Sequence, residues 1–205
     1  MNTIQHRTIN MMPVTTMTHS QWIQIADGYT QLATDRIKDG FEMYLLTFMF
    51  HKIMAGGYAV RAAMYREVER IYATLLTRIV REPRKASPTD LPLWIVCPDF
   101  PVPKSKKLNL AVVTVNDGQH LHALALIPPS SRLHRPFDAE VRRNQGLLTG
   151  NGTNTMRVDA VHVVNQHRYV ADYGLKALRS GRVGFDDIML LPRVVSELPS
   201  KGSGA

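Results

Sequence analysis

Two histidines in the middle of the chain have the type and spacing of metal ligands. His120 and His122 flank Leu121, and the apolar run 123–127 follows them. Successive side chains of a β-strand point to opposite faces, so these two imidazoles project to the same side. Imidazole nitrogens bind divalent transition ions, and a carboxylate usually completes such a site. The pair predicts half of a metal site; the alternative is a structural histidine pair on a half-exposed strand.

The third ligand is left open by the sequence. Asp117 is the nearest carboxylate before the histidines, and we predict it as a metal ligand. It is also part of Asn116-Asp117-Gly118, a tight-turn signal, in which an aspartate needs no metal. Asp159 and Glu42 are further carboxylates that could approach the histidines in space.

Two tyrosines and a lysine form a second candidate group. Tyr169 and Tyr173 are neighbours on one face if their segment is helical, and Lys176 follows three residues after Tyr173. A free phenol titrates at about pH 10, so a tyrosine nucleophile needs a nearby cation or metal to favour the phenolate. Lys176 could supply that charge or hold a phosphate. The alternative is that both tyrosines pack in the core or at its rim beside a solvated lysine.

The elements that must position these side chains alternate between strands and helices. Apolar periodicity predicts helices over 20–38, with Ser20 as N-cap and Gly40 as stop, and over 58–80, 137–148 and 168–179. It predicts strands over 43–50, 93–97, 110–115, 120–127 and 156–164. The turn at 116–118 predicts a hairpin that pairs 110–115 with 120–127. A hairpin among helices predicts an α+β fold, with a central antiparallel sheet and flanking helices.

The order of these motifs resembles the HUH endonuclease superfamily of rolling-circle initiators, relaxases and related transposases. Its apolar strand with threonine is matched by Leu45-Leu46-Thr47-Phe48, and its histidine motif by His120-Leu121-His122. Its tyrosine helix is matched by Tyr173-Gly174-Leu175-Lys176. With Tyr169 added, that helix is similar to the two-tyrosine helix of phage gene A type initiators. The resemblance covers about residues 43–180 and implies a ferredoxin- or RRM-like sheet with the histidines on its middle strands.

The resemblance also implies an activity. A Mn or Mg ion held by His120 and His122 would serve a phosphodiester transesterification in which Tyr173 forms a 5′-phosphotyrosine with single-stranded DNA or an origin hairpin. Tyr169 would be a second nucleophile or a packing partner, and Lys176 an assisting cation. The expected role is plasmid or phage rolling-circle replication; relaxases and transposases share the chemistry, and a non-catalytic basic DNA-binding protein on this fold is the alternative.

The chain departs from the family in two respects. The family often carries a Glu or Gln upstream of the histidines as a metal ligand, and 108–115 contains neither. The chain also lacks the phosphate-binding Gly-x-x-x-x-Gly-Lys-[Ser/Thr] motif of a helicase. The nuclease domain is therefore expected to act alone or to recruit a host helicase.

Composition bounds the partner and the compartment. The 205 residues carry a formal net charge of +8, which favours a polyanionic partner. The single cysteine, Cys97, is expected to be a buried hydrophobe, and no apolar run is long enough to cross a membrane. We expect a cytoplasmic protein with an N-terminal extension over 1–40 that contains a helix, a nuclease domain over 41–195 and a flexible tail over 196–205.

Overall fold

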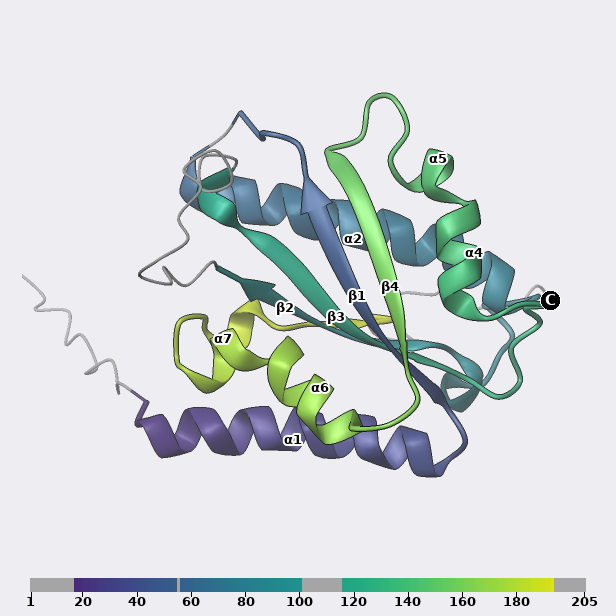
Figure 1. Cartoon of the computed structure of the whole chain (residues 1–205), viewed down its shortest axis with the longest axis horizontal. Helices are drawn as coiled ribbons and strands as arrows, with labels where there is room; N and C mark the ends of the chain where they lie inside the picture. The colour runs from purple at the N-terminus through teal and green to yellow at the C-terminus, as the bar shows by residue number, and fades with distance from the viewer. Residues whose placement is uncertain (1–16, 55, 101–115, 194–205) are drawn as a thin grey trace, which may run out of the picture.

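A five-stranded antiparallel sheet forms the centre of the molecule. In the computed structural model, residues 17–54, 56–100 and 116–193 are described. The sheet has the order β4-β1-β3-β2-β5 (Figure 1). Its strands are β1 (Glu42–Phe50), β2 (Leu93–Asp99), β3 (His120–Ile127), β4 (Thr155–Val163) and β5 (Met189–Leu191). The predicted α+β class with a central antiparallel sheet is confirmed.

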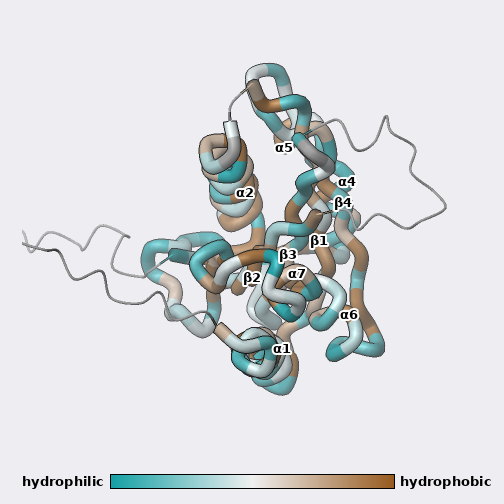
Figure 2. Tube along the Cα trace, turned by 90° about the vertical axis from the view of Figure 1, so that its left-hand side faces the viewer, coloured by the Kyte–Doolittle hydropathy of each residue, from teal (hydrophilic) through white to brown (hydrophobic). Residues whose placement is uncertain are grey.

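Helices cover both faces of this sheet (Figures 1 and 2). One face carries α2 (Gly57–Ile79), α4 (Phe137–Arg143) and α5 (Gln145–Leu148), and the other carries α1 (His19–Lys38), α6 (His167–Gly174) and α7 (Lys176–Arg179). Short 3₁₀ turns lie at η1 (Pro88–Asp90), η2 (Asn116–Gly118) and η3 (Phe185–Asp187). From β1 to β4 the chain follows the β-α-β-β-α-β order of ferredoxin-like folds.

No described helix combines the length and the apolar character that crossing a bilayer requires.

The alternation of side chains in β1 shows how the two faces are filled. Tyr44, Leu46 and Phe48 join the core beneath α2 and α4. Met43 joins the core beneath α1, α6 and α7, and Leu45 packs against it. Because both faces are covered, the inner strands read as nearly continuous apolar runs. A polar side chain on an inner strand therefore has to find its partners inside the protein.

The predicted hairpin between 110–115 and 120–127 is wrong. One edge of β3 pairs with β1 and the other pairs with β2, so no edge is left for a third strand. The segment 110–115 itself lies outside the described residues, and 116–118 forms a 3₁₀ turn. β2 takes the place expected for 110–115, and it continues to Asp99, two residues beyond its predicted end.

Three helix predictions need correction. The helix predicted over 137–148 is divided into α4 and α5, which meet at Asn144. The N-cap of α1 is Thr18 rather than Ser20, and the Thr18 hydroxyl accepts a hydrogen bond from the Gln21 backbone amide. The helix predicted over 168–179 is divided into α6 and α7, which meet at Leu175. At Gly174, an added Cβ would lie 3.1 Å from Leu124 Cδ2, so the end of α6 packs closely on β3. That close approach holds Tyr173 and Lys176 against the sheet.

The packing of the segment after α7 against α1 can be tested at Gly181. Its φ is +66°, and an added Cβ would lie 3.0 Å from the Trp22 indole. We expect Gly181→Ala to lower the free energy of unfolding by about 2 kcal/mol, because it combines left-handed backbone strain with a steric clash. Gly28→Ala is the matched control, since Gly28 lies in α1 with open space around it, and it should stabilise by up to about 1 kcal/mol. Urea unfolding measures both; equal losses would contradict the described packing.

Candidate metal centre

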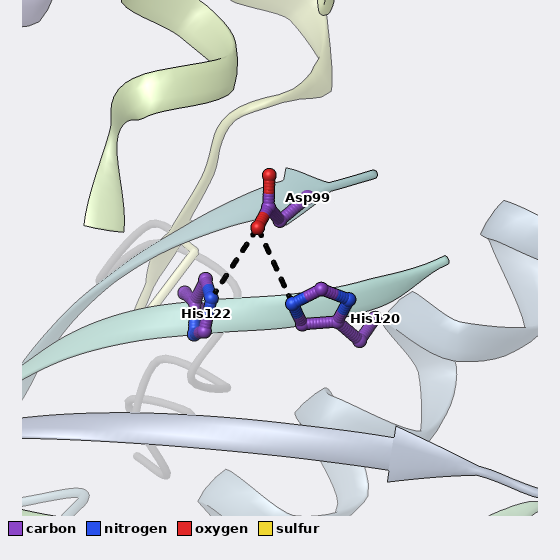
Figure 3. Close-up of side chains that lie close together, drawn as sticks. All are labelled: Asp99, His120 and His122. Carbon is purple, nitrogen blue, oxygen red and sulfur yellow. Dashed lines mark ion pairs between the residues drawn. The ribbon is translucent and has the colours of Figure 1, made fainter. Parts of the chain in front are cut away.

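Three potential ligands converge where β2 ends and β3 begins. The strand register places Asp99 directly opposite His120. Asp99 Oδ2 lies 3.3 Å from His120 Nε2 and 3.6 Å from His122 Nε2 (Figure 3). One ligand atom from each of the three residues lies within 4.8 Å of the other two. Two imidazoles and a carboxylate at this spacing could hold a metal ion.

The centre is enclosed on the sheet side and open at its rim. Asp99 and His122 are buried, whereas the side chain of His120 is 20% exposed. An ion or a small ligand therefore reaches the centre past His120, at the end of the sheet. The buried members lie beneath α6 and α7, on the same face as Leu124 and Leu126.

The hydrogen bonds of the histidines leave lone pairs available for a cation. His120 Nδ1 lies 3.2 Å from the Gly118 carbonyl oxygen, which can only accept, so Nδ1 carries the proton. In neutral His120 an unprotonated Nε2 then faces the Asp99 carboxylate, and these groups repel each other unless a cation lies between them. His122 Nδ1 contacts the Thr47 hydroxyl at 3.1 Å, and its buried Nε2 has no hydrogen-bond partner. Nε2 of His120 thus offers a lone pair, and Nε2 of His122 offers one when the Thr47 hydroxyl accepts the Nδ1 proton, so both atoms suit a metal ion in this centre.

A lysine ammonium interacts with the same carboxylate oxygen. Lys176 Nζ lies 2.6 Å from Asp99 Oδ2, and Arg182 Nη2 lies 3.5 Å from Oδ1. Burial raises the pKa of the Asp99 carboxyl, but donation from the two imidazoles, when they carry a proton on Nε2, and from the Lys176 ammonium outweighs burial and holds that pKa well below its usual range. Asp99 is therefore a carboxylate, the form that ligates a metal. Its contribution to folding stability is lost only as the pH falls through this lowered pKa.

Tyr173 lies directly beside the centre. Its ring centroid is 5.4 Å from that of His122, and Lys176 Nζ lies 4.1 Å from the centroid of its ring. Tyr173 is 42% exposed, so a ligand from solvent can reach it. Tyr169 lies one turn earlier in α6 and is 68% exposed. The structure thus brings His120, His122, Tyr173 and Lys176 together and leaves Tyr169 at the surface.

The carboxylates expected from the sequence lie elsewhere or are not described. Glu42 pairs with Ile127, at the opposite end of β3 from His120. Asp159 lies on β4 opposite Thr47, with β1 between it and the histidines, and it forms an ion pair with Arg157. The side chain of Asp117 lies outside the described residues, so its role as a ligand stays a prediction.

Asp99 is the potential ligand that sequence reasoning missed. It follows Cys97-Pro98 at the end of an apolar strand, and it shares the period-two face of Ile95 and Cys97. A carboxylate that continues the alternation of a buried strand was the available signal. Pro98 lies between Cys97 and Asp99, and a proline favours the end of a strand.

Cys97 pairs with His122 in the strand register, and this position makes it a possible metal ligand. Burial raises the pKa of its thiol to about 12. The thiol lies 3.4 Å from the Pro98 carbonyl, to which it donates. A protonated, buried thiol is a poor metal ligand, so Cys97 is part of the core, as expected from the sequence.

Comparison with known proteins adds no relative: no family model, no curated protein and no solved structure matches this chain.

Removal of Asp99 tests the centre itself. We expect Asp99→Asn to weaken Mn²⁺ binding by roughly a hundredfold or more, because the anionic ligand between the imidazoles is lost. Asp117→Asn is the matched control and should change the affinity by less than about twofold, since Asp99 already completes the group. Isothermal titration calorimetry measures both, with circular dichroism to verify folding. The reverse order of effects would make Asp117 the ligand.

Lys176 should compete with the metal for Asp99. An ion bound to Asp99 Oδ2 must displace or repel the ammonium that lies 2.6 Å from it. We therefore expect Lys176→Met to tighten Mn²⁺ binding by about tenfold, which corresponds to one charge-assisted contact of about 1.4 kcal/mol. Arg168→Met removes the same charge from an exposed position of α6 and serves as control. Unchanged or weaker binding by Lys176→Met in a titration would show that the ammonium and the ion do not compete.

Proposed function

We propose that this chain is a metal-dependent enzyme of the HUH type, which cleaves and rejoins single-stranded DNA through a covalent phosphotyrosine. The observation that carries the proposal is the position of Tyr173 beside a metal-capable group, with its ring centroid 5.4 Å from that of His122. A phosphodiester at the exposed side of the centre would meet the metal ligands and the phenol together. Either group without the other would favour no particular reaction.

The meeting of separate motifs supports the same proposal. Thr47, from the apolar motif of β1, contacts His122 of the histidine motif, and His122 contacts Tyr173 of the tyrosine helix. These residues are far apart in sequence, and the fold brings them to one place. Asp99 precedes the histidines and supplies an upstream carboxylate, the ligand for which 108–115 offers no Glu or Gln.

The chemistry follows from the residues around the scissile phosphate. A divalent ion held by Asp99, His120 and His122 would supply Lewis-acid polarisation of that phosphate. The Tyr173 oxygen attacks phosphorus and forms a P–O bond as its proton passes to solvent. The P–O3′ bond breaks, and the leaving 3′ oxygen takes up a proton. Lys176 favours the charge that develops on the phenol, and the retained phosphodiester energy lets the 3′-hydroxyl reverse the step without ATP.

The donor set favours manganese over magnesium. Mg²⁺ prefers oxygen ligands and retains its waters, whereas two of the three protein ligands here are imidazole nitrogens. We therefore propose Mn²⁺ as the working ion and expect Mg²⁺ to bind more weakly.

The biological setting proposed here is initiation of plasmid or phage rolling-circle replication on an origin strand or hairpin. A host helicase would separate the duplex. The exposed Tyr169 is available as a second nucleophile once a strand moves along α6. Relaxases and transposases would use the same residues.

A second candidate function has its own supporting observation. Lys176 and Arg182 already neutralise Asp99, so the carboxylate is also satisfied by ion pairs without a metal. That arrangement favours a non-catalytic, basic DNA-binding protein on this fold. It predicts binding to DNA, no response to Mn²⁺ and no covalent product.

Covalent capture of DNA separates the two functions. With Mn²⁺ and a randomised single-stranded oligonucleotide pool, we expect a denaturant-resistant adduct on gels when the fluorophore is at the 3′ end of the DNA. A 5′ fluorophore should stay on the released fragment, because Tyr173 retains the 5′ phosphate of the downstream piece. Tyr173→Phe should reduce the adduct by at least about a hundredfold.

Tyr169→Phe is the matched control, with the same change one helical turn away, and should retain most of the first adduct. An undiminished adduct in Tyr173→Phe would reject Tyr173 as the nucleophile. No adduct from the wild type with any divalent ion would favour the non-catalytic function.

A further inference from the structure

Four arginines surround a small cavity at the far end of the sheet. The cavity, of about 280 Å³, lies where the last turn of α2, the loop after β3 and α4 meet. Arg78, Arg132, Arg135 and Arg143 line it, together with one carboxylate, Glu140. Four guanidinium groups against one carboxylate leave a local excess of positive charge.

Glu140 fixes two of these arginines in place. It is buried, with Oε1 3.4 Å from Arg78 Nη1 and Oε2 3.7 Å from Arg135 Nε. Asn144 Nδ2 donates to Oε1 at 2.7 Å and secures the carboxylate from the other side. The buried acid is therefore satisfied by partners that it orients toward the cavity.

The other two arginines are free to meet a ligand. Arg132 and Arg143 are exposed, and no carboxylate of the described residues forms an ion pair with either of them. The backbone amide of Arg132 donates to the Ile79 carbonyl at 2.9 Å, so the loop that carries it is fixed to the end of α2. Their guanidinium groups repel the neighbouring charges until an anion enters the cavity.

We propose that this cavity binds a phosphate group of a nucleic-acid strand. Guanidinium forks match phosphate oxygens in geometry, and several together suit an anion with multiple acceptors. At about 280 Å³ the cavity lies at the small end of the roughly 300–1,000 Å³ of pockets that enclose a whole organic ligand. A phosphate can enter it while the rest of the strand stays outside, as in a backbone contact.

The cavity is separate from the candidate metal centre. The eight residues of β3 span about 23 Å between their first and last positions, at about 3.3 Å per residue. The metal centre lies at the first of these residues, and the loop that follows the last one lines the cavity. The two sites also lie on opposite faces, because α2 and α4 cover one face and α6 and α7 cover the other. A single strand at Tyr173 must cover at least about 23 Å to reach the arginines, which takes about four or more nucleotides at the roughly 6 Å per nucleotide of an extended strand, nearly twice the duplex rise.

The choice of a nucleic-acid strand over a free phosphorylated molecule rests on the proposed function, whereas the phosphate chemistry rests on the arginines alone. The experiment uses the full chain with EDTA, so that neither metal nor cleavage contributes to binding. Fluorescence anisotropy measures the affinity for a 30-nucleotide single strand and for a 3-nucleotide one at several salt concentrations.

We expect Arg132→Gln/Arg143→Gln to bind the long strand about tenfold more weakly and to reduce the salt slope by about one. The short strand, which fits either site but cannot connect them, should show a smaller loss. Arg81→Gln/Arg142→Gln removes two charges near the cavity without altering its lining and should lose no more than about twofold. Arg132→Lys/Arg143→Lys keeps the charge but not the forked guanidinium groups, and its affinity for the long strand should lie between those of the two glutamine variants.

Three results would overturn the proposal or its parts. If Arg132→Gln/Arg143→Gln and Arg81→Gln/Arg142→Gln lose the same affinity for the long strand, net charge alone explains the loss and the phosphate site is rejected. Arg132→Gln/Arg143→Gln could bind the strand normally and yet no longer be stabilised against heat by inorganic phosphate. That result would reject a nucleic-acid strand as the ligand in favour of a free phosphorylated molecule. Strand binding through the cavity without any Tyr173 adduct would reject the proposed nicking while the phosphate site stands.

Discussion

The complete enclosure of β3 is the constraint on which the other features depend. Its two edges pair with β1 and β2, and its two faces are covered by helices. His122 is therefore buried in the sheet, where an imidazole without partners would be costly. Thr47 on one neighbouring strand supplies a hydrogen-bond partner for Nδ1, and Asp99 on the other places a carboxylate oxygen 3.6 Å from the unpartnered Nε2. The polar group is thus assembled by the same strand pairing that closes the core.

Asp99 then determines how α6 and α7 sit on the sheet. A buried carboxylate requires positive partners, and Lys176 at the start of α7 and Arg182 just after α7 both reach it. Gly174 permits the close approach that these ion pairs need, since a side chain there would press on Leu124. Tyr173 directly precedes Gly174 at the end of α6, so this packing also places the Tyr173 ring beside His122. The position of the proposed nucleophile is set by an ion pair and a missing side chain.

Local patterns predicted β1 to β4 and the two long helices, but not β5, because the alternation of β1 and the periodicity of α1 and α2 are local properties. They also predicted that His120 and His122 share a face, which requires only that their segment be a strand. Strand pairing is not local: the turn at 116–118 suggested its sequence neighbour as the partner of β3, and β2 occupies that position instead. Asp99 was missed for the same reason, because its proximity to His120 comes from register across two strands.

Asp99 and Glu140 show how one arrangement can serve ligands of opposite charge. Each is a buried carboxylate that holds two cationic side chains. Around Asp99 the remaining neighbours are imidazoles, whose lone pairs attract a second cation once the lysine gives way. Around Glu140 the remaining neighbours are guanidinium groups, which have donors only and attract an anion. The ligand proposed for each end of the sheet therefore follows from the side chains that surround the carboxylate.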